Sequence, residues 1–250
     1  MLPDCLGDRM KNYESVPKTR LMPKMPVMLR LDGKAFHTFT RSCKRPYDPA
    51  FHSCMWKAAI ALCQQIDGCR LAYVQSDEIT LLLTDWSSVH TQAWFGYEVQ
   101  KLCSVSAGIC SVAFYAAWLK LGLETKRLPS FDARCWNLPV SEVTNAFIWR
   151  QQDASRNSCS MLAQAYFSPK QLHGVSMTGQ QEMLMSKHDI NWNDCPTAMK
   201  RGVCVVKESY TIPVARDDGT TTTCSRTRWV VDEEIPLFTA DRSYIERHLT

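Results

Sequence analysis

The order of the expected elements in residues 27–137 constrains the fold more than any other feature of this sequence. Alternating apolar residues in VMLRL, 27–31, predict a half-buried strand that stops at an Asp-Gly pair. An Asp-Pro helix start then precedes apolar residues that recur at three- and four-residue steps over 49–66. Two apolar runs, 69–75 and 79–83, follow with so few residues between them that a hairpin is the natural connection.

A second long helix and a further strand, expected over 95–116 and 130–138, complete the order strand, helix, strand, strand, helix, strand. This is the split βαβ pattern of an antiparallel ferredoxin-like sheet with both helices on one face, and it places the chain in the α+β class. The apolar stripes expected to face the sheet are Phe51, Met55, Ala58, Leu62 and Ile66 on the first helix and Phe95, Val99, Leu102, Val105, Ile109, Val112 and Ala116 on the second.

The second half of the chain has a different texture. Helical patterns follow Pro139, and two strand-like runs flank residues 216–219 as a probable hairpin. The sequence shows neither an internal repeat nor a Gly/Ser linker. We therefore expect a catalytic domain over 1–138 and a helical and β-hairpin extension over 139–250 that packs onto it.

Composition excludes some classes of protein. With 45% hydrophobic and 22% charged residues the chain is a soluble globular protein, and 29 Lys and Arg against 25 Asp and Glu permit an anionic partner without indicating one. No run of 18 uninterrupted apolar residues predicts a membrane span, and the first thirty residues are polar, so we expect no membrane association and a cytoplasmic location. The twelve cysteines lack Cys-x-x-Cys spacing, which favours reduced thiols over a zinc or disulfide framework.

Two acidic residues stand where apolar runs stop. Asp32 ends the first expected strand, and Asp77 lies in the expected hairpin. In an antiparallel ferredoxin-like sheet the two carboxylates reach the same edge, where they could bind Mg²⁺ together with substrate phosphates, as in the palm of nucleotidyl-transfer enzymes. Gly33 fits such a site because its backbone can approach a metal or a triphosphate closely. Two ordinary polar turns would give the same local sequences, and Glu78 is either catalytic or a structural carboxylate, because successive extended residues point to opposite faces.

Several longer segments together carry a family resemblance. The segments are RLDGKAFHTFTRSCKRPYD, YVQSDEITLLL, FDARCWNLP, NAFIWRQQDASRNS, INWNDCPTAMKRGVCVVK and VVDEEIPLFTADRSYI. From about residue 8 to the end, the chain resembles the tRNA-histidine guanylyltransferase superfamily. The resemblance implies a polymerase-like palm and an enzyme that adds nucleotides to the 5′ end of tRNA in the 3′-to-5′ direction.

The resemblance also implies the chemistry. ATP activates a 5′-monophosphorylated RNA as an adenylylated end, and the 3′-hydroxyl of the incoming GTP or other nucleoside triphosphate then attacks and expels AMP. A 5′-triphosphate end needs no activation. Both routes depend on in-line positioning and charge stabilisation with two Mg²⁺ ions rather than on a dedicated base.

Site residues follow from the matching positions. The resemblance implies that Asp32, Gly33 (through its carbonyl) and Asp77 ligate Mg²⁺, and that Asp32, Asp77, Glu78 and Lys44 are catalytic. The implied nucleotide-binding residues are Arg30, Asp32, Gly33, Lys34, Ala35, Phe36, His37, Ser76, Asp77 and Lys101, with Phe36 packed near a base. The implied RNA-binding residues are Arg150, Asp153, Asn157, Lys200 and Arg201.

One segment departs from the guanylyltransferase branch. That branch carries His-Ile-Asn-Asn-Leu-Tyr-Asn after Trp-Arg-Gln, whereas residues 155–160 here read SRNSCS and keep only Asn157 clearly. This pattern resembles the "like protein" branch, in which template pairing selects the nucleotide and 5′-truncated tRNA is repaired. The alternatives are the histidine-tRNA guanylyltransferase itself and a catalytically idle RNA-binding relative or palm-type nucleotide cyclase.

The resemblance further implies a homotetramer built as a dimer of dimers. Trp94, Tyr97 and Trp118 are candidates for apolar surface in its interfaces, although the same residues could be ordinary core.

Overall fold

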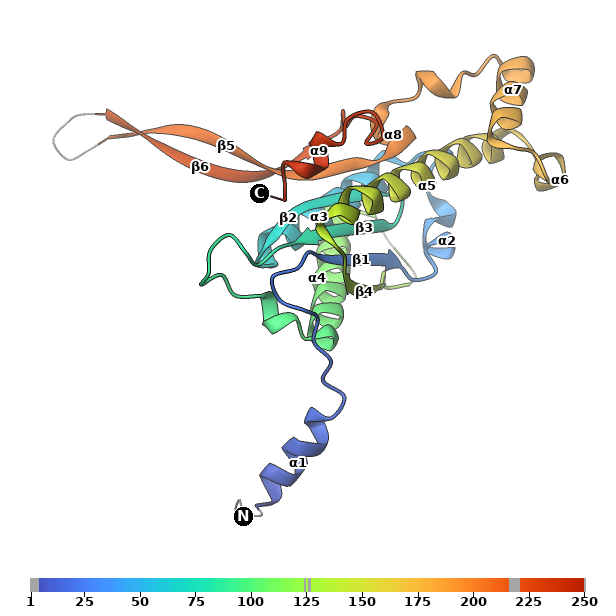
Figure 1. Cartoon of the computed structure of the whole chain (residues 1–250). Coiled ribbons are helices and arrows are strands. Elements are labelled where there is room, and N and C mark those ends of the chain that lie inside the picture. Colours follow the sequence, from blue (N-terminus) through green and yellow to red (C-terminus); the bar gives the residue numbers. More distant parts are fainter. Residues whose placement is uncertain (1–4, 124, 126, 216–220, 250) are drawn as a thin grey trace.

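The computed structural model describes residues 5–123, 125, 127–215 and 221–249 (Figure 1). Its centre is a six-stranded sheet in the order β4-β1-β3-β2-β5-β6, in which every neighbouring pair is antiparallel. The strands are β1 (Val27–Gly33), β2 (Cys69–Gln75), β3 (Glu78–Leu83), β4 (Phe131–Asn137), β5 (Val203–Ala215) and β6 (Thr221–Asp232). The first four strands, with one long helix between β1 and β2 and another between β3 and β4, have the predicted ferredoxin-like order.

The helices lie on both faces of the sheet and beyond its ends (Figure 1). The α-helices are α1 (Leu6–Ser15), α2 (Phe36–Phe39), α3 (Pro49–Gln65), α4 (Val99–Lys120), α5 (Val140–Tyr166), α6 (Pro169–Leu172), α7 (Met177–His188), α8 (Thr197–Arg201) and α9 (Ser243–Glu246), and the 3-10 turns are η1 (Thr40–Ser42), η2 (Trp94–Tyr97) and η3 (Trp192–Asp194). Helices α3 and α4 share one face, as predicted, while α5 covers the opposite face, so β3 is buried along its whole length.

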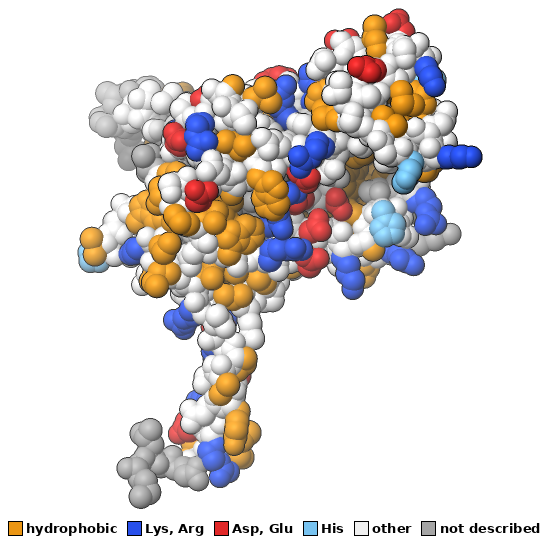
Figure 2. Space-filling model, turned by 45° about the vertical axis from the view of Figure 1, so that its right-hand side comes forward, with side chains coloured by type: hydrophobic (Ala, Val, Ile, Leu, Met, Phe, Trp, Pro, Cys, Tyr) orange, Lys and Arg blue, Asp and Glu red, His pale blue; other side chains and the backbone are white. Residues whose placement is uncertain are grey.

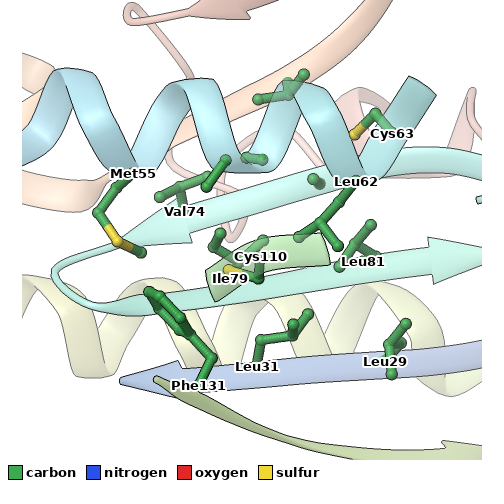
Figure 3. Packing of buried hydrophobic residues seen from close by; sticks show 14 of the residues in the cluster. Leu29, Leu31, Met55, Leu62, Cys63, Val74, Ile79, Leu81, Cys110 and Phe131 are labelled. Carbon is green, nitrogen blue, oxygen red and sulfur yellow. The ribbon is translucent and has the colours of Figure 1, made fainter. Parts of the chain in front are cut away.

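The core under α3 and α4 follows the two-residue period of the strands. Leu29 and Leu31 of β1 and Leu81 of β3 point into it, and Leu62 of α3 packs on them (Figure 3). All five residues of the stripe predicted for α3 are buried. The twelve cysteines all carry free thiols, and several of them, such as Cys110, pack here as small apolar side chains.

The stripe predicted for α4 is correct only in part: Leu102 is completely buried and Val105 and Ile109 pack against the core, but other positions differ. Val112 is 70% exposed, whereas Ser106 and Cys110 are completely buried. Helix α4 is apolar on nearly all sides, so periodicity does not identify its inner face. Among the described residues it is the one helix long and apolar enough to cross a membrane by length and composition, and in this structure it packs against α3 and the sheet.

The aromatic residues suggested for oligomer contacts are core residues instead. Trp94, Tyr97 and Trp118 are at most 7% exposed in the single chain. Their large apolar area is already buried against the sheet, so they offer no surface to a second copy.

The C-terminal half extends the same sheet. Strand β5 pairs with β2 through Val203 and Val74, and β6 pairs with β5 along twelve residue positions. The predicted hairpin strands are therefore confirmed, while the predicted turn at 216–219 lies outside the described residues. The segments 1–138 and 139–250 share one sheet, and the hairpin projects beyond the body of the molecule (Figure 1).

Candidate active site

The two acidic motifs meet at one edge of the sheet. Asp32, at the end of β1, lies opposite Glu78 of β3, and the next residue, Gly33, donates its backbone N–H to the carbonyl oxygen of Asp77 at 3.1 Å. Asp77 occupies a two-residue turn with Ser76, whose φ of 47° is left-handed. The prediction that Asp32 and Asp77 converge is thus confirmed by the register of β1 and β3.

Burial and mutual repulsion disfavour the ionised form of both carboxyls. Burial raises the pKa of Asp77 most, and the charge of Asp32 adds to this, against hydrogen bonds from its own backbone and from Ser76. Burial also raises the pKa of Asp32, with further repulsion from Glu78 and Asp132. Two carboxylates held close together in this way are suited to a cation that neutralises them.

The donor set fits Mg²⁺ rather than a metal that requires a closed protein cage. Nowhere in the described part of the chain do three or more His, Cys, Asp or Glu residues form a group that could hold an ion. Mg²⁺ needs fewer protein ligands, because it keeps several waters and takes oxygens from substrate phosphates. Asp32, Asp77 and the carbonyl of Gly33 are compatible with that arrangement.

A pocket of about 400 Å³ opens beside Asp77. The loop after β1 forms one wall through Gly33, Ala35 and His37, and Lys44 brings a positive charge to it. Ala35 has a left-handed φ of 56°, a strained conformation for a residue with a side chain, which is typical of loops shaped around ligands. The pocket has the size and the mixed charge expected of a nucleotide site.

A second hollow of about 350 Å³ lies on the other side of the same turn. Ser76, Asp77, Met161 and Gln164 border both hollows, and Asp32 borders only the second. Figure 2 shows acidic side chains gathered in a hollowed face with Lys and Arg side chains around them. Asp77 can therefore contact a ligand in either hollow, and Asp32 can contact a ligand in the second.

Helix α5 supplies a wall of which the sequence analysis identified Asp153 and Asn157 but missed Ser160 and Gln164. Its residues Asp153, Asn157, Ser160 and Gln164 border the second hollow at steps of three and four residues. The signal in the sequence from which the whole wall could have been predicted is this polar stripe on a helix whose other faces carry many apolar residues.

Phe36 is a core residue that also borders the nucleotide pocket, and its predicted packing near a base stays a prediction. Its side chain is 3% exposed, and its ring centroid lies 4.9 Å from that of Phe131, 5.2 Å from that of Phe39 and 5.5 Å from that of Phe114. The ring anchors the nucleotide loop to the core, so only its backbone and edge remain available to the pocket.

The same ring explains why residue 33 is glycine. A Cβ at Gly33 would lie 2.4 Å from Cδ2 of Phe36. Replacing Gly33 by Ala should therefore destabilise the chain by about 2 kcal/mol, because Phe36 is held among aromatic rings and cannot move aside freely. Chemical denaturation measures the loss, with Gly108→Ala as control, since a Cβ there meets nothing within 4 Å. An unchanged stability of the Gly33→Ala protein would contradict this account.

Glu78 and Arg150 form a buried ion pair, which gives both residues a structural role, while the catalytic role predicted for Glu78 and the RNA-binding role predicted for Arg150 stay predictions. Arg150 donates from Nε and Nη2 to the two carboxylate oxygens of Glu78 at 2.7 and 2.6 Å. It also donates to Asp153 at 3.0 Å. With both donors engaged and only about a tenth of either side chain exposed, the pair ties α5 to β3 at the wall of the second hollow.

Lys101 also lies elsewhere than predicted. Helix α4 reaches the strand beside Gly33 through Ser111, whose hydroxyl accepts the N–H of Phe131, the strand partner of Gly33. Lys101 is ten residues earlier, about 15 Å along the helix, with Nζ over the ring of Phe95. Within one chain it therefore does not contact a triphosphate held at Asp32.

Two further predicted residues, Arg30 and Lys34, lie on either side of Asp32 in the sequence. Arg30 has the same strand face as Asp32, and its guanidinium lies between the rings of Trp136 and Trp149. Lys34 is exposed, and its backbone N–H binds the carbonyl of Ser130.

The predicted RNA-binding residues of the C-terminal half divide into two groups. Asn157 and Asp153 reach the second hollow. Lys200 and Arg201 lie on α8, where the Lys200 ammonium donates to the carbonyl of Asn193 and the Arg201 carbonyl accepts from Tyr73. Neither residue of α8 borders the two hollows beside Asp77.

A palm-like sheet with two adjacent carboxylates at its edge and a nucleotide-sized pocket beside them defines a nucleotidyltransferase of the palm class. The family model of tRNAHis guanylyltransferase matches residues 7–139. The chain belongs to this family, whose members act as nucleotidyltransferases on tRNA.

Known relatives cover most of the chain. A solved bacterial tRNA(His) guanylyltransferase-like protein in complex with ATP is 42% identical, with a TM-score of 0.89 over 98% of this chain and 99% of that one. Another such bacterial protein, in complex with GTP, is 39% identical, with a TM-score of 0.82 over 98% of both chains. The tRNA(His) guanylyltransferase of Schizosaccharomyces pombe is 30% identical over 79% of this chain and 78% of its own length.

Proposed function

We propose that this protein repairs 5′-truncated tRNA by template-dependent nucleotide addition in the 3′-to-5′ direction. The observation that carries the proposal is the pair of hollows on either side of Asp77. One has the size of a nucleoside triphosphate, and the other opens along the polar stripe of α5, where an RNA end could lie. The reacting 5′ phosphate and the incoming nucleotide would then meet at the carboxylate pair.

Asp32, Asp77 and the carbonyl of Gly33 would hold Mg²⁺ in this reaction. When bound, the ions would neutralise phosphate charge and polarise the phosphoryl oxygens. The protein's own contribution is positioning: the strained loop at Ala35 presents backbone groups to the triphosphate, and Lys44 adds a positive charge in the same pocket. Neither ATP-dependent activation of the RNA end nor nucleotide addition requires a further base.

The repair activity is favoured over the histidine-specific one by two observations. The identity to the bacterial guanylyltransferase-like proteins, at 42% and 39%, exceeds the 30% identity to the S. pombe enzyme. In addition, residues 155–160 lack the motif of the anticodon-reading branch. The second candidate function is that of a tRNA(His) guanylyltransferase, because the family model that matches the chain is described by this activity.

We also propose a homotetramer and a cytoplasmic location. The family resemblance of the sequence supports the tetramer, and a composition typical of soluble globular proteins is compatible with the location.

Two substrates separate the candidate functions. The enzyme, ATP, Mg²⁺ and all four nucleoside triphosphates are given either a tRNA that lacks its first 5′ nucleotide or a full-length tRNA(His) transcript. We expect the truncated tRNA to react with a kcat/KM at least about tenfold higher, because template pairing supplies the specificity. The added nucleotide should follow a compensatory change in the opposing 3′ strand.

The control is a tRNA(His) with an altered anticodon. Faster reaction of full-length tRNA(His), lost when its anticodon is changed, would establish the guanylyltransferase instead. Tight tRNA binding without incorporation of any nucleotide would favour a binding protein.

A further inference from the structure

An exposed indole continues the polar stripe of α5. Trp149 lies four residues before Asp153, which is about 6 Å along the helix and the same step that separates Asp153 from Asn157. Tryptophan side chains are mostly buried in folded proteins, but Trp149 is 50% exposed. The ring therefore stands open to solvent beside the helix face that borders the second hollow.

Arginine side chains of the sheet lie beside this ring. The guanidinium of Arg30, on β1, lies 5.5 Å from the indole of Trp149 and 5.6 Å from that of Trp136, on β4. Arg134 is the cross-strand partner of Arg30, and its side chain is 51% exposed where it binds Asp132. Because directly opposed residues of neighbouring strands share a face, the two arginines and two indoles form one surface on the α5 side of the sheet.

This surface is continuous with the candidate active site. Arg30 is two residues from Asp32, about 7 Å of strand, and points to the same face. Arg150, the residue after Trp149, borders the second hollow, and its guanidinium lies 4.6 Å from the Trp149 ring. Figure 2 shows hydrophobic and basic side chains directly beside the acidic ones of the hollowed face. A ligand that leaves the second hollow along α5 therefore meets the indole after about one helical turn.

The chemistry of the surface suits an unpaired nucleobase. An indole stacks on any base, because every base has a π face, and neighbouring guanidinium groups attract the phosphates of the backbone. Bases inside a double helix are stacked on one another, so a protein ring reaches a base in a single-stranded segment. Trp149 keeps half of its surface accessible even with two guanidinium groups beside it, which leaves room for such a base.

We propose that the indole of Trp149 stacks on an unpaired base of the RNA strand that continues past the reacting 5′ end. Arg30 and Arg134 attract the phosphates of that strand. This inference rests on the proposed function, which places an RNA end in the second hollow. In a 5′-truncated tRNA the template strand is unpaired opposite the missing nucleotides, so the contact would hold the template next to the carboxylates.

Equilibrium binding of two RNA hairpins tests the contact. Both hairpins have the same stem, one ends in unpaired 3′ nucleotides and the other is blunt, and nucleoside triphosphates are left out so that no reaction occurs. Trp149→Leu keeps apolar volume but removes the flat ring. It should weaken binding of the overhanging RNA at least about fivefold and binding of the blunt RNA less than about twofold.

Two further variants serve as controls. Trp149→Phe keeps a ring that can stack and should bind both RNAs within about twofold of the parent chain. Tyr13→Leu removes a ring that is 73% exposed on α1, away from the sheet, and should likewise change neither affinity (Figure 1). Equal losses for both RNAs in Trp149→Leu, or no loss for either, would overturn the proposed stacking.

Nucleotide addition separates this inference from the proposed function. If the parent chain binds the overhanging RNA through Trp149 but adds no nucleotide to truncated tRNA, the repair activity is refuted and the stacking contact stands. If Trp149→Leu repairs truncated tRNA normally and binds both hairpins as the parent chain does, only the stacking contact is refuted. A higher KM for ATP in this variant, with unchanged RNA affinity, would also refute it, because the ring would then hold a mononucleotide.

Discussion

The Asp77→Ala protein is expected to lose nucleotide addition by at least about 10³-fold in kcat, while its affinity for tRNA stays within about twofold of the parent chain. Asp77 lies between the two hollows and beside Asp32, so its loss removes half of the carboxylate pair. It contributes no positive charge to RNA binding. Single-turnover incorporation with saturating Mg²⁺ measures the rate, and filter binding measures the affinity.

The thermal stability of a second variant at this position, Asp77→Asn, provides another readout. The pKa of Asp77 is raised in the folded chain, so the native state holds its proton more tightly than the unfolded chain does. The resulting penalty is absent well below the ordinary pKa of 3.8 and grows as the pH rises through the folded value. At pH 7 without Mg²⁺, an Asp77→Asn protein should therefore unfold at a temperature no lower than the parent chain.

Asp132 offers a matched control. It is the β4 partner of Asp32, but its side chain is 56% exposed, and it binds Arg134 rather than lining either hollow. Asp132→Ala should keep nucleotide addition within about threefold, and Asp32→Ala with Asp77→Ala should be no slower than either single variant. Near-normal addition by Asp77→Ala would show that the two carboxylates do not form one site.

The sequence was sufficient to predict the meeting of Asp32 and Asp77. Strand periodicity, the short connection before β3 and the order of elements together determine an antiparallel ferredoxin-like sheet, and that topology brings the ends of β1 and β3 to one edge. The convergence therefore follows from local patterns and chain order, without knowledge of any side-chain contact.

The structural roles that the sequence left undetermined share a physical cause, which is that each role is decided by a partner distant in sequence. Phe36 is a core residue because Phe114 and Phe131 surround it, and Glu78 is structural because Arg150, 72 residues later, binds it. A family pattern indicates that such residues lie near the site, but it does not distinguish contact with a ligand from support of the loop that makes the contact.

Part of the buried face of α4 and the contribution of Ser160 and Gln164 of α5 were missed for a different reason. Helix α4 is apolar around its circumference, so many stripes fit the period equally well. The polar stripe of α5 has meaning only once the helix is known to cover the face of the sheet that carries Asp32. Both depend on how elements pack, which hydrophobic periodicity alone does not determine.

Replacing Arg150 by Met is expected to destabilise the chain by about 3 to 5 kcal/mol, the largest stability effect predicted here. The variant leaves the Glu78 carboxylate buried, with only about a tenth of its side chain exposed and with Thr80 as its remaining side-chain donor. An unpaired buried charge loses its solvation without compensation. Urea denaturation at pH 7 measures the change in the free energy of unfolding.

Two further variants identify the cause. Arg156 lies on the same helix and also binds Asp153, but its side chain is 58% exposed, so Arg156→Met should change stability by less than about 0.5 kcal/mol. Adding Glu78→Leu to Arg150→Met removes the stranded charge and should restore most of the lost stability. The double variant should also retain nucleotide addition within about tenfold of the parent chain, because Glu78 supports β3 rather than reacting. A double variant that is stable yet as inactive as Asp77→Ala would show that Glu78 is catalytic and would overturn its assignment to a purely structural role.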